Sequence, residues 1–473
     1  MRQFLLVAIS LLLCTQTQAQ TKDVWTLERC VQYALEHNIS IQQDVLNERL
    51  AKLTLLQSQL AQLPSVNASS NYGSSFGRSI NPTTNQFQDV SYNFLSFSGS
   101  ANVLLFGWFQ QRNTIAKNTF SKDAAKADLD QLRSDVSLNI ATGFLRLLQA
   151  KEQVKISEKQ VELSKAQLFQ TQKFAEVGRL PELNVAQLES QLATDSSNLI
   201  TNIANYNSSI LDLKALLNLE FSTTLDILVP DINVADQVML ASMNPEYIYQ
   251  EARKHYGAIR SSELKLKAAQ KAKNASFAGL LPQLSAGAQV GTNWASNYQQ
   301  YTQSTSLAYY TPFYDVNHQL VLQPNYLPIV SDIPFSRQLN SNLRQTVTLN
   351  LNVPIFNAWQ ASTAYRQAKI NVQSQELNQY QTDLNLKQTV YKAYNDAISS
   401  IQKYNAAKHA ADAAARALDF AKKRYDMGLT NTIEYLTTQN TNYTAESNLL
   451  SAKYDLIFKL KVIDFYLGKE LKL

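Results

Sequence analysis

Residues 343–356 read LRQTVTLNLNVPIF, and they separate two kinds of sequence. As far as Val353, apolar and polar residues alternate, which is the period-two pattern of a β-strand with one apolar face. From Ile355 to Met427 the chain contains neither glycine nor proline. A helix of about 70 residues would be about 105 Å long, far longer than the usual globular helix. We therefore expect a strand that leads directly into a very long helix.

The distribution of helix-breaking residues extends this pattern to the whole chain. Of the 12 Gly and 11 Pro, 15 lie in two windows, Pro64–Gly107 and Gly279–Pro354. The other long stretches contain no Gly or Pro, apart from a single Gly143. They are Lys22–Leu63, Trp108–Val177, Glu182–Val229 and Leu429–Leu467. The sequence predicts a mainly α chain with a small β part, confined to inserts at about 64–107 and 282–354.

The two inserts and their flanking helices follow one pattern. VLLF at 103–106 and VPIF at 353–356 lie 250 positions apart, and Val177–Gly178 and Met427–Gly428 share that offset. Leu63–Pro64 and Leu281–Pro282 lie 218 apart, so the second insert is 32 residues longer than the first. A constant offset over such a distance indicates duplication of a whole unit. We predict one unit, residues 21–473, made of two repeats at about 21–230 and 231–473.

The first 20 residues have the composition of a secretory signal peptide. Arg2 supplies the positive region, Phe4–Leu13 the apolar region, and Thr17–Ala19 a cleavage site of small residues. A lipoprotein would use Cys14, but the preceding Leu13 disfavours that interpretation. Removal of residues 1–20 leaves Cys30 as the only cysteine, so no disulfide within the chain is expected.

Charge and hydropathy exclude two classes of protein. The chain carries 43 Lys+Arg and 38 Asp+Glu, a formal charge of +5 that is spread along the sequence. Without a basic run, nucleic acid is not expected as a partner. After the signal peptide no apolar stretch is long enough for a spanning helix. An exported chain of this kind can still enter a membrane by contributing strands to a closed barrel.

The inserts have the pattern of membrane-spanning strands. Leu284–Trp294 and Leu343–Val353 each alternate over about 11 residues, the length of a tilted spanning strand. The first insert alternates more weakly within 66–72 and 93–105. Four strands cannot close a barrel, and open edges are not tolerated in lipid, so the chain must oligomerise. The alternative is a half-buried hairpin in a soluble domain.

Two segments between the strands are expected to be surface loops outside the cell. One is Ala295–Leu339, which is rich in Tyr, Pro, Asn and Gln. The other, about Gly77–Asp89, is its shorter counterpart in the first insert.

Two short segments join the long helices into hairpins. They read EVGRLPELNV at 176–185 and YDMGLTNTIEYL at 425–436. In each segment a glycine stands where a left-handed residue commonly ends a helix. Pro181 suits the first turn of the helix that follows. The residues at the exposed tips of the two hairpins include Gly178, Leu180, Gly428 and Leu429.

The order and spacing of these features resemble the TolC family of outer-membrane efflux and secretion channels, over essentially the whole mature length. The features are the signal peptide, the two Leu-Pro entries to the strands, the duplication, and Tyr425-x-x-Gly428 followed by Ile433, Leu436 and Gln439. The resemblance implies long α-helical hairpins packed as a coiled-coil-like α-barrel. It also implies four transmembrane β-strands per protomer, which complete a 12-stranded β-barrel in a homotrimer.

The resemblance further implies a place and a function. The protein would lie in the outer membrane of a Gram-negative bacterium, in contact with its lipid, with a large periplasmic part. It would be the exit duct of a tripartite efflux pump, passively conducting small molecules. A periplasmic adaptor (membrane fusion) protein and an inner-membrane pump of RND or ABC type would be its partners. The adaptor would dock at the helical tips, on Gly178, Leu180, Gly428 and Leu429. The alternative is the exit duct of a type I protein secretion system.

Site residues carry over from the family in part. Glu434 matches a position where acidic side chains from three protomers ring the entrance, and such a ring favours cations. Tyr425 matches a tyrosine that tethers the closed coils, but the basic partner of that tether would fall at Thr430. Asn184 is the first-repeat equivalent of Glu434. Arg179 is a candidate for a different closing contact, by spacing.

No catalytic or metal-binding motif is present. The four histidines, His37, His255, His318 and His409, are scattered without metal-ligand spacing. The sequence predicts no enzyme, no cofactor and no metal. A third interpretation, a periplasmic coiled-coil scaffold without a pore, leaves the alternating strands and the constant offset unexplained.

Overall fold

The computed structural model describes residues 24–80, 85–89, 91–228 and 244–469. The predicted signal peptide (1–20), Cys14 and the predicted repeat boundary near residue 230 lie outside these ranges. The chain forms two compact units. The helical unit contains Met1–Lys52, Phe120–Leu266 and Ser374–Leu473, and the strand unit contains Leu53–Thr119 and Lys267–Gln373.

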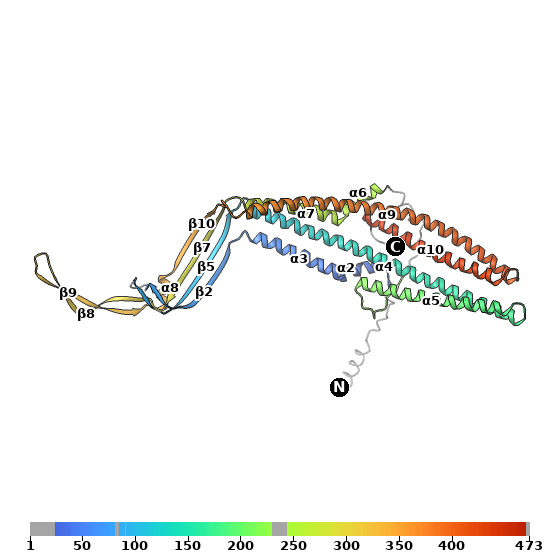
Figure 1. The fold of residues 1–473 in the computed structure, drawn as a ribbon, viewed down its shortest axis with the longest axis horizontal. Coiled ribbons are helices and arrows are strands. Elements are labelled where there is room, and N and C mark those ends of the chain that lie inside the picture. The colour runs from blue at the N-terminus through green and yellow to red at the C-terminus, as the bar shows by residue number, and fades with distance from the viewer. Residues whose placement is uncertain (1–23, 81–84, 90, 229–243, 470–473) are drawn as a thin grey trace, which may run out of the picture. The chain divides into compact units, whose positions relative to one another are not determined.

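Two pairs of long helices dominate the helical unit (Figure 1). Helices α4 (Gln110–Glu176) and α9 (Gln360–Asp426) have 67 residues each, and they begin 250 positions apart. Helix α5 (Glu182–Leu217) follows α4, and α10 (Thr432–Tyr466) follows α9. The long helices predicted from the absence of Gly and Pro are therefore confirmed.

Within the described part of the chain, no helix combines the length and the hydropathy that crossing a membrane requires.

The shorter helices recur in the same way, at an offset of 218. Helices α2 (Leu27–His37) and α6 (Pro245–His255) have 11 residues each, and α3 (Ile39–Leu60) and α7 (Gly257–Ala278) have 22 each. These matched lengths support the proposed division into two repeats.

A break that the search for Gly and Pro misses separates α2 from α3. The Asn38 side-chain oxygen accepts hydrogen bonds from the backbone N–H groups of Ser40, at 2.9 Å, and Ile41, at 3.3 Å. An asparagine in this position caps the second helix, because its amide replaces a missing intrahelical partner. Residues 24–63 are therefore not one helix, although they contain neither Gly nor Pro.

The strand-to-helix junctions are sharp turns in which non-glycine residues adopt positive φ angles. Trp108 and Phe109 have φ angles of 51° and 61°, and Ala358 and Trp359 have 51° and 62°. Left-handed conformations are costly for residues with a Cβ, so the surrounding structure must hold them in place. The indole N–H of Trp108 donates to the carbonyl of Pro282 at 2.8 Å. Both repeats thus end their strands with the same strained turn.

Four antiparallel strands of the strand unit form one sheet in the order β10-β7-β5-β2. They are β2 (Ser65–Ser75), β5 (Tyr92–Phe106), β7 (Gln283–Ala295) and β10 (Arg344–Asn352). The two alternating stretches of the second insert are therefore strands, as predicted. Among the described residues, β2 and β10 each have one edge without a partner strand.

The register of the sheet separates apolar from polar residues. One row across the four strands is Val347, Ala288, Ala101 and Val66. The neighbouring row, on the opposite face, is Thr346, Gln289, Ser100 and Asn67. Val347 is 82% exposed and Val66 76% exposed, so the apolar face is uncovered within one chain. An uncovered apolar face of this kind requires a further apolar environment.

The segment expected to be a long loop, Ala295–Leu339, is largely regular. It contains β8 (Gln299–Tyr314), β9 (Leu320–Asp332) and the short helix α8 (Phe335–Ser341). The predicted surface loop is therefore mostly a strand hairpin, because prolines are tolerated in strands whose outer edge is free. The shorter loop likewise contains β3 (Arg78–Ile80) and β4 (Phe87–Asp89), which pair with each other.

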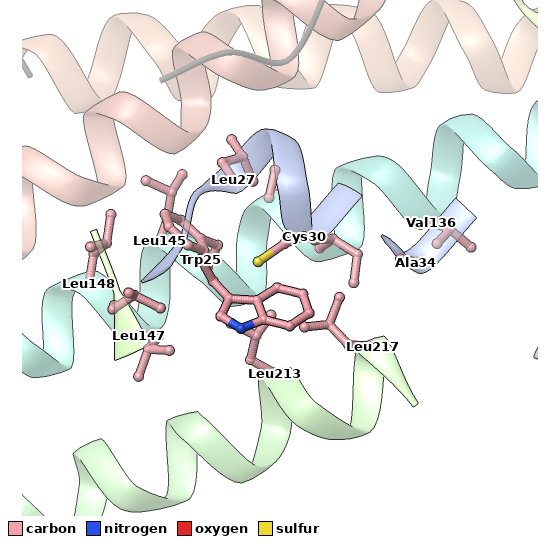
Figure 2. Packing of buried hydrophobic residues seen from close by; sticks show 14 of the residues in the cluster. Trp25, Leu27, Cys30, Ala34, Val136, Leu145, Leu147, Leu148, Leu213 and Leu217 are labelled. Atoms are coloured by element: carbon pink, nitrogen blue, oxygen red, sulfur yellow. The ribbon is translucent and has the colours of Figure 1, made fainter. Parts of the chain in front are cut away.

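The apolar core of the helical unit lies where the short elements meet the long helices. Strand β1 (Val24–Trp25) pairs in parallel with β6 (Asp226–Ile227), and Trp25 packs beside Cys30, Leu213 and Leu217 (Figure 2). Cys30 is fully buried, and burial raises the pKa of its thiol to about 12, so it stays protonated. A second cluster joins α6, α9 and α10 through residues that include Ile248, Leu386, Val390 and Ile463.

Helix α6 is attached to α9 by a polar network around Glu246. The carboxylate accepts hydrogen bonds from Gln250 at 3.0 Å and from Tyr391 at 2.7 Å, and it lies 3.1 Å from the Lys387 Nζ atom. The hydrogen bonds from Gln250, Tyr391 and Lys387 lower the pKa of Glu246 from 4.5 to about 2. This carboxylate is therefore ionised in the folded chain under conditions that protonate it in the unfolded chain.

The Glu246 network predicts a pH-dependent stability. Because its folded pKa is depressed, its contribution is present above about pH 4.5 and is lost as the pH falls towards 2. Glu246→Gln should lower the thermal unfolding midpoint near neutral pH, and the difference from wild type should shrink over that acid range. Glu251→Gln, which alters a carboxylate paired with Lys254 on the same helix, is the matched control. A difference that stays constant with pH would contradict the assignment.

Candidate functional site at the helical tips

Both long hairpins end in the same turn. Gly178 and Gly428 have φ angles of 72° and 75°. In the first turn the N–H of Gly178 bonds to Ala175 and that of Arg179 bonds to Phe174, at 2.9 and 2.8 Å. In the second turn Gly428 bonds to Tyr425 and Leu429 bonds to Arg424, at the same two distances. These are Schellman motifs, in which a left-handed glycine satisfies the last carbonyls of a helix.

The two tips lie together around one cavity. It has a volume of about 580 Å³ and is lined by residues of both turns. Six of the eight predicted site residues line it, and Gly178 and Glu434 do not. The six are Arg179, Leu180, Asn184, Tyr425, Gly428 and Leu429.

Tyr425 joins the two hairpins. Its hydroxyl lies 3.1 Å from the Thr171 hydroxyl of α4 and 3.3 Å from the Thr432 hydroxyl of α10. Its ring stacks on Tyr435, with centroids 5.0 Å apart. Beside it, the Gln170 amide donates to Asp426 at 3.1 Å. Burial raises the pKa of Tyr435 to about 12, so this ring stays neutral.

Glu434 has a basic partner that the sequence did not reveal. Its backbone N–H donates to the Asn431 side chain at 2.7 Å, which caps α10. Its carboxylate lies 3.5 Å from the Arg424 guanidinium, and both side chains are more than half exposed. Arg424 also donates to the carbonyl of Leu429 at 3.3 Å. An exposed ion pair of this kind contributes little stability, but the positive guanidinium offsets the negative charge of the carboxylate.

The two first-repeat candidates lie near this turn without a hydrogen bond to Tyr425. The Arg179 guanidinium stacks over the Phe174 ring, 4.7 Å from its centroid. One of its nitrogens is 3.8 Å from the position that a Cβ atom would take at Gly428. The backbone N–H of Asn184 bonds to Pro181 at 3.0 Å, inside the first turn of α5. Arg179 therefore lies against the opposite tip, and Asn184 lines the cavity.

Behind the tips, a stripe of polar residues runs along α4 into the interface between the hairpins. Its members are spaced alternately four and three apart, and five of the six are more than nine-tenths buried. We call this stripe the polar seam: Gln153, Ser157, Gln160, Ser164, Gln167 and Thr171. Such spacing places residues in the centre of a coiled coil, where apolar side chains are usual.

The polar seam bonds across to the second hairpin. Ser157 meets the Tyr443 hydroxyl at 3.0 Å, and the Gln439 amide donates to Ser164 at 3.1 Å. The side-chain amides of Gln191 on α5 and Asn440 on α10 also exchange two hydrogen bonds, at 3.0 and 3.2 Å. These contacts between the hairpins are hydrogen bonds between neutral groups, each contributing about 0.5–1.5 kcal/mol net.

Some of this network is incomplete. Asp195 of α5 is 3% exposed and accepts hydrogen bonds from Gln160, Ser164 and Gln191. In contrast, Gln167 Nε2, Gln439 Oε1 and the Tyr435 hydroxyl are buried without a hydrogen-bond partner in the described part of the chain. A partly satisfied polar interface is less stable than a packed apolar one. The contact between the hairpins is therefore weak for its length along the polar seam.

The sequence pointed to the turns but missed the seam. Thr171, Arg424 and Asp426 were not among the predicted site residues, although they contact Tyr425, Glu434 and Gln170. The alternating four-and-three spacing of Ser and Gln along α4 was the available signal. In the described ranges, no group of His, Cys, Asp and Glu side chains could hold a metal ion.

The chain is similar in sequence to known outer-membrane and secretion proteins. A profile of the family described as outer membrane efflux protein matches residues 30–219 and 248–469. Outer membrane protein TolC of Escherichia coli (strain K12) is 22% identical over 335 residues, which are 70% of this chain and 61% of TolC. Alkaline protease secretion protein AprF of Pseudomonas aeruginosa is 29% identical over 126 residues, 26% of each chain.

The fold is shared with solved structures. The open-state structure of the Neisseria gonorrhoeae MtrE outer membrane channel matches with a TM-score of 0.70 and 16% identity. The match covers 94% of this chain and 89% of that chain. At such low identity the likeness shows the fold. Against the two curated relatives, the matched region spans 61% of TolC and 26% of AprF.

The left-handed conformation of Gly428, at the second tip, leads to a testable prediction. Gly428→Val should destabilise the turn by about 1–2 kcal/mol, because a Cβ is unfavourable at positive φ. Amide hydrogen exchange in residues 424–435 should then be roughly 5–30-fold faster. Gly428→Asn is the matched control, since asparagine tolerates this conformation better. Equal exchange in wild type and both variants would contradict the role of the glycine.

Proposed function

Because the chain belongs to the outer membrane efflux protein family, as its sequence predicted, we propose that three copies form a passive exit duct for small molecules across the outer membrane. In this proposal a periplasmic adaptor protein and an inner-membrane pump deliver the molecules to the helical tips. The family is one of channels rather than enzymes. The proposal requires no cofactor.

The observation that carries this proposal is the four-stranded sheet. One face is apolar and the other polar, and β2 and β10 have open edges within the described chain. Open edges cannot face lipid, because their N–H and C=O groups would lack partners. Pairing β2 of one copy with β10 of the next satisfies both edges. Three copies then close a 12-stranded barrel, with lipid outside and water inside.

We propose that the tips form the gate of this duct. The support is the polar seam and the Tyr425 contacts, which join the two hairpins through hydrogen bonds of modest strength. A contact built this way can separate and re-form, because water satisfies the same groups when the hairpins part. An apolar seam of equal length would hold the hairpins together more firmly.

Glu434 remains our candidate for the constriction, together with its newly found partner. Three copies would place three carboxylates near one axis and favour cations. Within each copy, the Arg424 guanidinium lies 3.5 Å from the Glu434 carboxylate and offsets part of its charge. We therefore propose an entrance whose selectivity depends on the balance of the two side chains. The apolar residues Leu180 and Leu429 would meet the adaptor.

Two alternatives remain distinct from this proposal. The partial likeness to AprF, a protein named for alkaline protease secretion, favours a second candidate, the exit duct of a type I protein secretion system. A periplasmic coiled-coil scaffold without a pore would leave the apolar face of the sheet unused. The scaffold would be extracted without detergent, whereas a duct would not.

Planar-bilayer conductance tests the duct. We expect protein purified in detergent to have the mass of three chains and to give discrete, cation-preferring channels. A water-soluble monomer without channel activity would overturn the proposal and leave the scaffold. Genetic neighbours then separate efflux from secretion: a proton-driven pump and adaptor, or an ABC exporter and its protein substrate.

The gate contact predicts the effect of two conservative variants. Thr171→Val and Tyr425→Phe each remove one hydroxyl from the contact, so each should raise the open fraction of single channels by roughly two- to tenfold. Thr441→Val is the matched control, since its hydroxyl bonds to Thr437 within α10 at 2.8 Å. If the control opens the channel as much as the two variants, the seam is not the gate.

Substitutions of Glu434 and Arg424 at the proposed entrance should change ion selectivity in opposite directions. Glu434→Gln should reduce cation preference and weaken block by multivalent cations, and Arg424→Gln should strengthen both. The measurement is reversal potential in a salt gradient, with the block recorded on the same channels. Changes of the same sign in both variants would show that the pair does not line the constriction.

A further inference from the structure

Strands β8 and β9 form a long hairpin of their own. Each pairs only with the other among the described strands, over Gln299–Tyr314 and Leu320–Asp332. The turn between them is ordered by Asp315, whose carboxylate accepts from the N–H groups of Asn317 and Gln319 at 2.8 and 2.9 Å. A two-stranded sheet is marginally stable alone in water. Figure 1 shows this ribbon extending past the end of the four-stranded sheet.

The base of the hairpin is held firmly. Gln338 of α8 is 2% exposed, and its amide bonds to both backbone groups of Ala295 and to the carbonyl of Ile333, at 2.9–3.1 Å. Asn342 donates to the carbonyl of Asn293 at 2.8 Å, and Trp294 packs on Phe335. The direction of the ribbon is therefore set by β7, not by a loose linker.

One face of the outer half of the ribbon is wholly apolar or aromatic. The register places Tyr310 opposite Pro324, Pro312 opposite Leu322, and Tyr314 opposite Leu320. Alternate residues of a strand share a face, so these six form one surface, which we call the tip face. Tyr310, Tyr314, Leu320 and Leu322 are each more than half exposed.

The same ribbon carries almost no charge. Between Gln299 and Ser331 the only formally charged side chain is Asp315, in the turn. Exposed edges of natural sheets are usually protected by charged residues. In this ribbon prolines protect the edges instead. Pro312 lies on β8, and Pro324 and Pro328 lie on β9. Proline has no N–H to offer, so the addition of another strand along either edge is disfavoured. Contact must therefore use the face.

We propose that the tip face packs against the same face of neighbouring copies, so that three hairpins meet above the mouth of the duct. This inference rests on the proposed trimer. A separate protein partner usually needs about 20–30 residues on each side, and the tip face offers six. Copies joined through one barrel have an effective concentration of about millimolar order, so a small contact suffices. Without charge on the face, identical surfaces do not repel one another.

Cysteine crosslinking tests this contact. Leu322→Cys places a thiol on the tip face, and Gln323→Cys places one on the opposite face of the same strand, as the matched control. The full-length trimer, in detergent and in outer membranes, is treated with a short bismaleimide. We expect crosslinked dimers and trimers from Leu322→Cys, in several-fold excess over Gln323→Cys. A monofunctional maleimide should label both thiols, which shows that both are accessible.

The outcomes separate this inference from the proposed function. The mass of untreated protein reports the trimer by itself, so a monomer would defeat the proposed duct. A trimer with no crosslinks, or with equal crosslinks at both positions, would overturn the contact between tip faces alone. Crosslinks in cells to a different protein, or protection of Leu322→Cys by surface polysaccharide, would also overturn it. A second variant pair, Leu322→Lys and Gln323→Lys, should lower the trimer dissociation temperature only at position 322.

Discussion

The open edges of β2 and β10 are the constraint on which the rest of the structure depends. Within the described chain these edges leave backbone N–H and C=O groups unpaired, on a sheet with one apolar face. Such a sheet is stable neither alone in water nor alone in lipid. Closure by identical neighbours solves both problems at once. The duplicated helices then have to match one another, and α4 and α9 do so with 67 residues each.

The helical unit contains two kinds of interface, an apolar core and the polar seam, and their chemistry suits different roles. Around Trp25, Cys30 and Leu213 the packing is dry and close, which suits a part that stays fixed. Along the polar seam, Ser157, Ser164 and Thr171 occupy positions that apolar residues take in ordinary coiled coils. Removing water from these groups yields little net free energy, because they exchange one hydrogen bond for another. In the gate that we propose, such a balance lets the hairpins separate and re-form.

Prediction from the sequence succeeded where one residue type dictates local geometry. The long helices followed from the absence of Gly and Pro, and the tip turns followed from Gly178 and Gly428, which do adopt positive φ. Prediction failed where a helix break or a turn depends on residues other than Gly and Pro. Asn38 ends a helix by capping the next one, and Trp108 and Phe109 adopt positive φ although neither is a glycine. The prolines of the second insert suggested a loop, although Pro312 and Pro324 lie within strands.

By itself, the sequence determined the two alternating inserts, the very long helices between them and the positions of the tips. These depend on periodicity and on backbone restrictions of Gly and Pro, which act over a few residues. Only the tertiary structure decided which distant residues meet: Thr171 with Tyr425, Arg424 with Glu434, and Tyr310 with Pro324. Arg424 and Glu434 are ten positions apart, and Thr171 and Tyr425 are separated by 254. Contacts of this kind arise from the register of packed helices and paired strands, which no local pattern specifies.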